Sequence, residues 1–139
     1  MTRVTFDAAF QNLDAIRQFI AEAARRAGFS EKDAYAIQSA VDEASANIIE
    51  HAYGGEGKGL IEVECTWSQD AFKVILRDRG QPFDPASVPE PNLSGDLSRR
   101  KVGGLGIYLM RRLMDEVEYR SSPVDGNVLT MVKRKGVET

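Results

Sequence analysis

The amino-terminal part of the chain combines two periodicities of hydrophobic and polar positions. Residues 2–6, TRVTF, alternate one by one, which predicts a short strand. From Phe10 onward the apolar residues return every three or four positions, which predicts a helix that Gly28 would end. Asp7 is placed to cap the start of this helix. The apolar side of the helix is expected to contain Phe10, Leu13, Ile16, Phe19, Ile20 and Ala23.

A second helix is expected to follow directly. SEKD at residues 30–33 resembles a capping box, in which a serine hydroxyl and an acidic side chain satisfy the first backbone N–H groups. The helical periodicity then continues to about Tyr53, where the glycine-rich stretch 54–59 breaks it. The apolar face of this helix is expected to contain Ile37, Val41, Ala44, Ile48 and Ala52.

The rest of the chain predicts four strands, one helix and one long loop. The loop is expected from Arg79 to Val102, where no periodicity is present, and a glycine-rich helix start follows it. The strands are expected at residues 60–67, 71–78, 116–122 and 127–135. This order predicts an α+β fold, a two-layer sandwich with helices over one face of a mainly antiparallel or mixed sheet, formed by a single domain over residues 1–139.

Composition and charge narrow the function classes. The chain has 139 residues, 42% of them hydrophobic and 28% charged, with a formal net charge of −3 and a pI of about 5.2. Such a charge argues against direct binding of nucleic acid or of an anionic membrane as the main activity. The single cysteine, Cys65, cannot form an internal disulfide, and no apolar run is long enough for a signal peptide or a membrane span. We therefore expect a complete, soluble, cytoplasmic domain.

Three polar residues of the second helix stand four positions apart: Glu43, Asn47 and His51. On an α-helix this spacing stacks them along one side over roughly 12 Å. One interpretation is a solvated helix face with a partly buried histidine. The other is a site in which the carboxylate accepts a proton and the amide oxygen binds a hard cation such as Mg²⁺. The helix alone does not decide between them.

Two further stretches favour the second interpretation. Asp78 begins DRGQPFD and stands at the end of a predicted strand, where a buried carboxylate can receive a hydrogen bond from a ligand. GGLG at residues 103–106 opens a helix behind three basic residues, so its N–H groups can approach a phosphate. Taken singly, these stretches are also explained by a turn, a hinge and scattered surface charge. Together with the helix they predict a nucleotide site.

Other well-known sites are absent from the sequence. There is no G-x-x-x-x-G-K-[ST] loop and no dinucleotide fingerprint. One cysteine and one histidine argue against a zinc site, and no G-x-S-x-G anchors a hydrolase triad.

In order and spacing, three blocks resemble the motifs of the GHKL, or Bergerat-fold, ATPases. EASANIIEHAY at residues 43–53 resembles the N box, DRGQPFD at 78–84 the G1 box and GGLGIYLM at 103–110 the G2 box. The resemblance extends from Thr2 to Lys133. It implies the Bergerat ATP-binding fold, with ATP and Mg²⁺ as cofactors.

The resemblance also implies roles for individual residues. Asn47 would coordinate the Mg²⁺ that bridges the ATP phosphates. Asp78 would bind the adenine amino group, with Gly80 allowing its close approach and Thr130 supporting the contact. His51 matches a common N-box residue and would pack rather than catalyse.

The phosphate end of the site is implied in the same way. Residues 84–102 would form the mobile ATP lid, and Lys101 or a neighbouring arginine would reach the terminal phosphates. The phosphate-contacting loop would consist of Gly103, Gly104, Leu105 and Gly106.

Within this superfamily the chain looks like the anti-sigma-factor serine/threonine kinases. Its one histidine already stands in the N box, and there is no room for the dimerisation helix of a sensor kinase. In this branch Glu43 would be the general base for a protein serine or threonine hydroxyl. The partners implied are a sigma factor and a STAS-type antagonist, with Arg17 presented to partners and a homodimer possible.

Two other interpretations stay open at this point. The chain could be a nucleotide-binding regulator that sequesters a partner protein without phosphorylating it, or an ATP-binding fragment of a larger sensor kinase.

Overall fold

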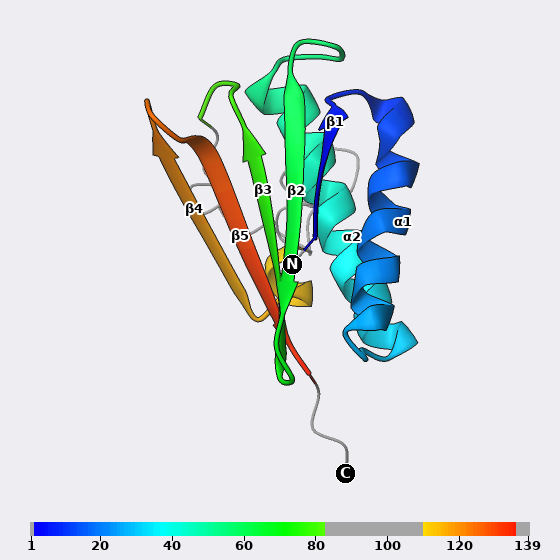
Figure 1. Ribbon diagram of the computed structural model, residues 1–139. Helices are drawn as coiled ribbons and strands as arrows, with labels where there is room; N and C mark the ends of the chain where they lie inside the picture. Colours follow the sequence, from blue (N-terminus) through cyan, green and yellow to red (C-terminus); the bar gives the residue numbers. More distant parts are fainter. Residues whose placement is uncertain (1, 83–109, 136–139) are drawn as a thin grey trace, which may run out of the picture.

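The fold is a single sheet with helices on one side, seen in a computed structural model that describes residues 2–82 and 110–135 (Figure 1). The elements in chain order are β1 (Thr2–Asp7), the 3₁₀ turn η1 (Phe10–Asn12), α1 (Leu13–Arg26), α2 (Glu31–Asn47), the π-helical turn η2 (Ile48–Ala52), β2 (Leu60–Trp67), β3 (Ala71–Asp78), β4 (Glu116–Ser122) and β5 (Gly126–Arg134). Residues 110–113 are also helical.

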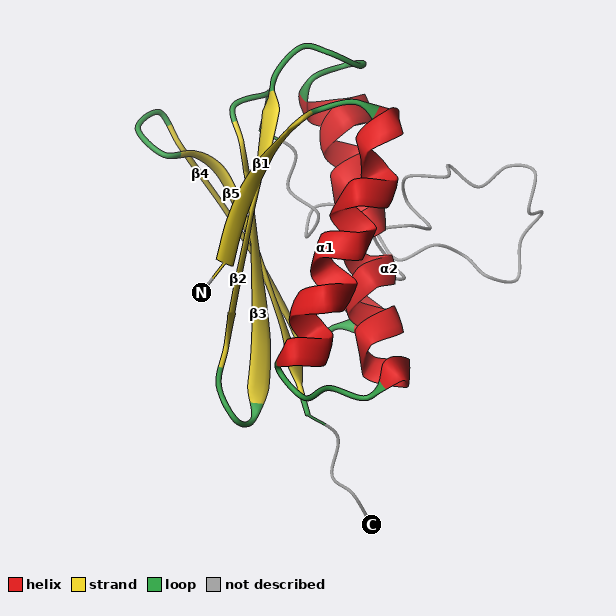
Figure 2. Ribbon diagram, turned by 45° about the vertical axis from the view of Figure 1, so that its right-hand side comes forward, coloured by secondary structure: helices red, strands yellow, loops and turns green. Residues whose placement is uncertain are grey.

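The five strands form one sheet in the order β1-β2-β3-β5-β4, and every pairing between them is antiparallel. Helices α1 and α2 lie side by side against one face of this sheet, as the turned view shows (Figure 2). The predicted two-layer α+β architecture and its predicted strands are therefore confirmed.

Buried and more exposed side chains alternate along the strands, so the two faces of the sheet differ in character. On the helix-covered face the strand side chains are apolar and buried, as in the pair Leu76 and Leu129. On the other face charged side chains pair with one another: the Arg77 guanidinium lies 3.2 Å from a Glu62 oxygen and 3.1 Å from a Glu64 oxygen. A shift of one residue in register would exchange these two sets, so the pattern fixes the pairing.

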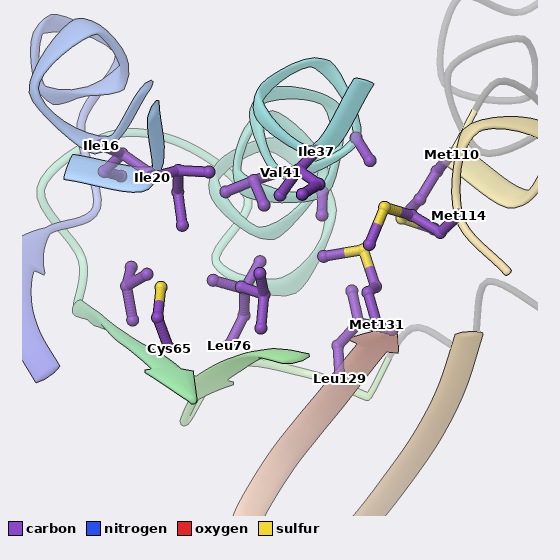
Figure 3. Packing of buried hydrophobic residues seen from close by; sticks show 14 of the residues in the cluster. Ile16, Ile20, Ile37, Val41, Cys65, Leu76, Met110, Met114, Leu129 and Met131 are labelled. Carbon is purple, nitrogen blue, oxygen red and sulfur yellow. The ribbon is translucent and has the colours of Figure 1, made fainter. Parts of the chain in front are cut away.

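The core lies between the helices and the covered face. Ile16 and Ile20 from α1 and Ile37 and Val41 from α2 point toward the sheet, where Cys65 is one of the side chains they meet (Figure 3). Burial, with the Glu64 charge adding to it, raises the pKa of the Cys65 thiol to about 12. The thiol is therefore protonated, and it acts as a small apolar core residue.

The helix ends agree with the sequence in two of three places. Ser30 caps α2, because its hydroxyl accepts the Asp33 N–H at 3.1 Å, and Gly28 ends the α1 segment with a φ of +83°. The prediction that Asp7 caps the first helix is wrong. Asp7 ends β1, and the turn η1 separates it from α1, whose own N-cap, Asn12, donates its side-chain amide to the Asp7 carbonyl at 2.8 Å.

The second helix reaches Tyr53, but its last turn is a π-helix. The Tyr53 N–H bonds to the Ile48 carbonyl at 3.0 Å, five residues back, in place of the α-helical four. This wider turn takes His51 out of line with Glu43 and Asn47. The His51 side chain is 41% exposed, which is more than the partly buried histidine of the first interpretation would suggest.

None of the helices among residues 2–82 and 110–135 could span a membrane.

Candidate functional site

The N-box helix and the end of β3 meet at one pocket. Asn47 and Asp78 both line it, from α2 and from the last position of β3. The pocket walls also include Ala44, Ile48, Ala52, Gln81, Met110, Tyr119, Asn127 and Leu129. Mostly apolar walls with a few polar groups are a common lining for small-molecule sites.

Asp78 is a buried carboxylate whose partners are dipoles. It is 6% exposed, and its Oδ1 accepts the Gly80 N–H at 2.9 Å and the Asn127 amide at 2.7 Å. Burial raises the pKa of Asp78, against the lowering effect of these two hydrogen bonds. Oδ2 makes no hydrogen bond to any residue that the structure describes, so it can accept one from a ligand.

Asn127 orients this carboxylate. It is 3% exposed and stands directly opposite Asp78 in the β3–β5 register. Its amide nitrogen also donates to the Gly80 carbonyl at 2.9 Å, while its oxygen accepts the Ser121 hydroxyl at 2.7 Å. Sequence reasoning missed Asn127. The available signal was the predicted hairpin, because pairing its second strand against residues 71–78 brings an early residue of that strand opposite Asp78.

Thr130 does not reach this pocket. It pairs with Ile75 on β3, and its two neighbours along β5, Leu129 and Met131, are buried on the covered face. Because side chains alternate along a strand, the Thr130 side chain lies on the open face. There it borders a groove that Arg77 and Arg120 also line. The structure therefore does not bring Thr130 to Asp78, and Asn127 occupies the place beside that carboxylate.

Gly80 is required by a contact within the protein. A Cβ added at Gly80 would lie 2.5 Å from the carbonyl carbon and oxygen of Ala52, closer than real Cβ contacts. The next N–H, that of Gln81, donates to the same Ala52 carbonyl at 2.7 Å. Gly80 thus allows the close approach of the η2 backbone, which joins the N box to the segment after β3, and its role toward adenine stays a prediction.

Asn47 is another buried polar side chain of this pocket. It is 8% exposed, and no hydrogen bond from any described residue engages its side-chain amide. Since it lines the pocket, its oxygen is available to a ligand or a cation there. The described residues contain no group of three or more His, Cys, Asp or Glu that could hold a metal alone, so a cation would need ligand oxygens as well.

Glu43 lies one helical turn before Asn47 and is half-buried, but it is not among the pocket-lining residues. Its pKa is raised by burial first and then by the negative charges of Asp42 and Glu50. Arg17 of α1 donates to Asp42 at 2.5 Å, with Asp14 at 3.3 Å as a second partner. The arginine predicted to face a partner protein is therefore also held by the helix that carries Glu43.

The remaining predicted site residues lie outside the described residues. These are Lys101, the loop Gly103, Gly104, Leu105 and Gly106, and the lid at 84–102. The first described residue after them, Met110, is helical and lines the pocket that holds Asn47 and Asp78.

Comparison with known proteins gives a consistent result. Residues 6–133 match the family described as the histidine kinase-like ATPase domain. The serine-protein kinase RsbW of Bacillus velezensis is 34% identical over 122 residues, which is 85% of this chain and 75% of that protein. The serine-protein kinase RsbW of Halalkalibacterium halodurans is 33% identical over 134 residues, which is 94% of this chain and 80% of that protein.

Two solved structures share the fold at low sequence identity. The RsbU and RsbW domains of Rv1364c from Mycobacterium tuberculosis superimpose with a TM-score of 0.67 at 20% identity, over 99% of this chain but only 34% of that longer chain. The catalytic domain of histidine kinase ThkA gives a TM-score of 0.55 at 15% identity, over 99% of this chain and 100% of that one.

Proposed function

The chain belongs to the family of histidine kinase-like ATPase domains, and from that premise we propose that it is an ATP-dependent serine/threonine protein kinase that regulates a sigma factor by partner switching. The observation that carries the proposal is the pairing of two buried polar side chains, Asn47 and Asp78, across one largely apolar pocket. Each has an acceptor oxygen that no described residue uses. The serine-protein kinases among its relatives supply the class of reaction.

Adenine recognition is assigned to Asp78. Asn127 and the Gly80 N–H both hold Oδ1, so Oδ2 is left to accept the adenine amino group. The amino group of adenine is a donor, whereas guanine presents an acceptor at the same position. A carboxylate therefore favours ATP over GTP, because a buried acceptor facing another acceptor is penalised.

The phosphates are assigned to the other end of the pocket, where Asn47 would hold Mg²⁺ through its amide oxygen. Bound Mg²⁺ supplies charge neutralisation for the phosphate oxygens during transfer. The glycine loop at residues 103–106 and Lys101 stay part of this proposal on the strength of the sequence motif alone.

Glu43 is the proposed general base. It precedes Asn47 by one turn, so a hydroxyl beside the metal-bound γ-phosphate would come within its reach. A raised pKa makes the carboxylate a stronger base than an ordinary glutamate, which suits removal of a hydroxyl proton.

The proposed partners are a sigma factor and a STAS-type antagonist, which would be the phosphorylated protein. Arg17 is proposed as a contact for partners, and its side chain is one-third exposed. Because Arg17 is already paired with Asp42, an acidic partner residue would compete with that carboxylate. We also propose that the protein works in the cytoplasm and can form a homodimer.

Transfer of labelled phosphate from γ-³²P-ATP to STAS-domain proteins tests the proposal. We expect Glu43→Gln to bind ATP normally but to transfer phosphate about 10² times more slowly. Glu22→Gln is the matched control, since Glu22 is exposed and pairs with Arg26 on α1. Its rate should equal that of the wild type.

Two results would overturn parts of this account. A Glu43→Gln variant with the wild-type rate removes the base assignment. ATP binding without transfer to any STAS-domain protein would support the alternative, a regulator that binds ATP and sequesters its partner without phosphorylating it.

A further inference from the structure

Tyr53, the residue directly after η2, has a hydroxyl that joins two distant backbone positions. It accepts the Arg79 N–H at 2.9 Å and donates to the Leu60 carbonyl at 2.7 Å. Arg79 directly follows Asp78, and Leu60 begins β2. The ring is half-buried and packs against the core. One side chain thus links the N-box segment, the start of β2 and the backbone after Asp78.

The backbone after Asp78 is held at three successive N–H groups. The Arg79 N–H bonds to the Tyr53 hydroxyl, and the Gly80 N–H bonds to Asp78 Oδ1 at 2.9 Å. The Gln81 N–H bonds to the Ala52 carbonyl at 2.7 Å. Two of the three acceptors therefore come from residues 52 and 53, and the Tyr53 hydroxyl holds the N–H that directly follows Asp78.

Tyr53 is held both at its backbone and at its ring. Its backbone N–H closes the π turn onto the Ile48 carbonyl at 3.0 Å. Its ring lies directly over Gly59, where an added Cβ would be 2.3 Å from two ring carbons and 2.7 Å from the hydroxyl oxygen. A hydroxyl fixed in this way can define the position of the N–H that it accepts.

We propose that Tyr53 is a positioning residue for base recognition. Its hydroxyl fixes the backbone after Asp78 and so sets where the carboxylate stands relative to Asn47 across the pocket. This inference rests on the proposed ATP site and adds a residue that the motif roles do not include. Without the hydroxyl, the carboxylate is displaced, and the site loses part of its preference for a base that donates an amino hydrogen over one that does not.

The test is Tyr53→Phe, which keeps the ring and removes only the hydroxyl. We expect ATP to bind about five- to tenfold more weakly, the cost of one hydrogen bond. GTP binding should change less, so the ratio of the two affinities falls. Amide exchange at Arg79, followed by NMR without nucleotide, should be faster than in the wild type. Tyr35→Phe is the matched control, since Tyr35 is 71% exposed on α2, and it should alter none of these values.

A second variant displaces the same hydroxyl without changing Tyr53 itself. Gly59→Ala pushes on the ring and should reproduce the loss of ATP preference and the faster Arg79 exchange. The proposal is wrong if Tyr53→Phe keeps the wild-type ratio and exchange rate, or if both variants simply lose the fold. If the wild type binds no ATP, the proposed function fails. The exchange at Arg79 then still shows whether the hydroxyl holds this backbone.

Discussion

Asp78 carries a buried charge that no cation of the described residues neutralises. Its partners are the Gly80 N–H and the Asn127 amide, and the Asn127 oxygen is in turn held by the Ser121 hydroxyl. Dipoles of this kind offset only part of the cost of burying the carboxylate, which is why its pKa is raised. A ligand amino group at Oδ2 would add a charge-assisted hydrogen bond in a place where water is largely excluded.

The raised pKa of Asp78 predicts a stability effect with a definite sign. In the folded state the protonated form is favoured, so the related stabilisation is present at low pH and is lost as the pH rises through the folded-state pKa. Asp78→Asn should therefore be at least as stable as the wild type at neutral pH. The difference should shrink as the pH falls into the ordinary range of aspartate.

Thermal unfolding of the two proteins between pH 3 and pH 8 checks this expectation. A variant that is clearly less stable than the wild type at pH 7 would show that the Asp78 charge is needed by the fold. Loss of ligand binding in that variant would then no longer report on recognition alone.

The environment of Glu43 predicts the pH dependence of phosphate transfer. Because Asp42 helps to raise the pKa of Glu43, Asp42→Asn should lower it and keep the base ionised to a lower pH. The acid limb of the single-turnover rate should move to lower pH in this variant. Asp33→Asn, in the first turn of the same helix, serves as the control and should leave the limb unmoved. A limb that stays in place or moves upward in Asp42→Asn contradicts the base assignment.

Among the elements, the π-helical turn η2 was not revealed by the sequence. Its residues have the same apolar spacing as a continued α-helix, and the choice between four- and five-residue hydrogen bonds is made by tertiary contacts. Here the contacts are those of the Ala52 carbonyl with Gln81 and of the Ala52 backbone with Gly80. The turn thus brings the N box against the segment after β3.

The contact between η2 and Gly80 predicts the effect of Gly80→Ala. The added methyl meets the backbone of Ala52, which cannot turn aside as a flexible side chain would. We expect the free energy of unfolding to fall by about 1–3 kcal/mol, the usual range for overpacking. Urea unfolding measures this change, and calorimetry should show weaker ATP binding by the folded variant.

The closest atoms at that contact belong to the Ala52 backbone, so removing the Ala52 side chain should not restore the loss. Full recovery of stability in the Ala52→Gly, Gly80→Ala double variant would contradict the proposed contact.

For the whole molecule, most of the architecture could be predicted from the sequence. Strand alternation, helical periodicity and the Ser30 cap each follow from local rules, and the helices and strands were expected close to where they lie. Asn47 and Asp78 could be selected because each stands in a recognisable motif. Their meeting in one pocket depends on how helix and sheet pack, which local patterns do not give.

Thr130 was expected to support the contact at Asp78, but Asn127 is the β5 residue beside that carboxylate. Local sequence patterns do not show which face of a strand a residue occupies. The two residues are three positions apart on β5 and therefore face opposite sides of the sheet. Only the register against β3 shows which of them stands beside Asp78. A motif fixes the kind of residue that is expected, whereas the pairing of strands fixes its face.

The central claim is that the pocket between α2 and the sheet binds Mg-ATP through Asp78. Titration calorimetry with Mg-ATP, comparing the wild type with Asp78→Asn, tests this claim most directly. We predict saturable binding by the wild type and a roughly tenfold to hundredfold weaker affinity in the variant, the range for a hydrogen bond to a charged group. Equal affinities would remove Asp78 from recognition, and no binding by the wild type would contradict the account as a whole.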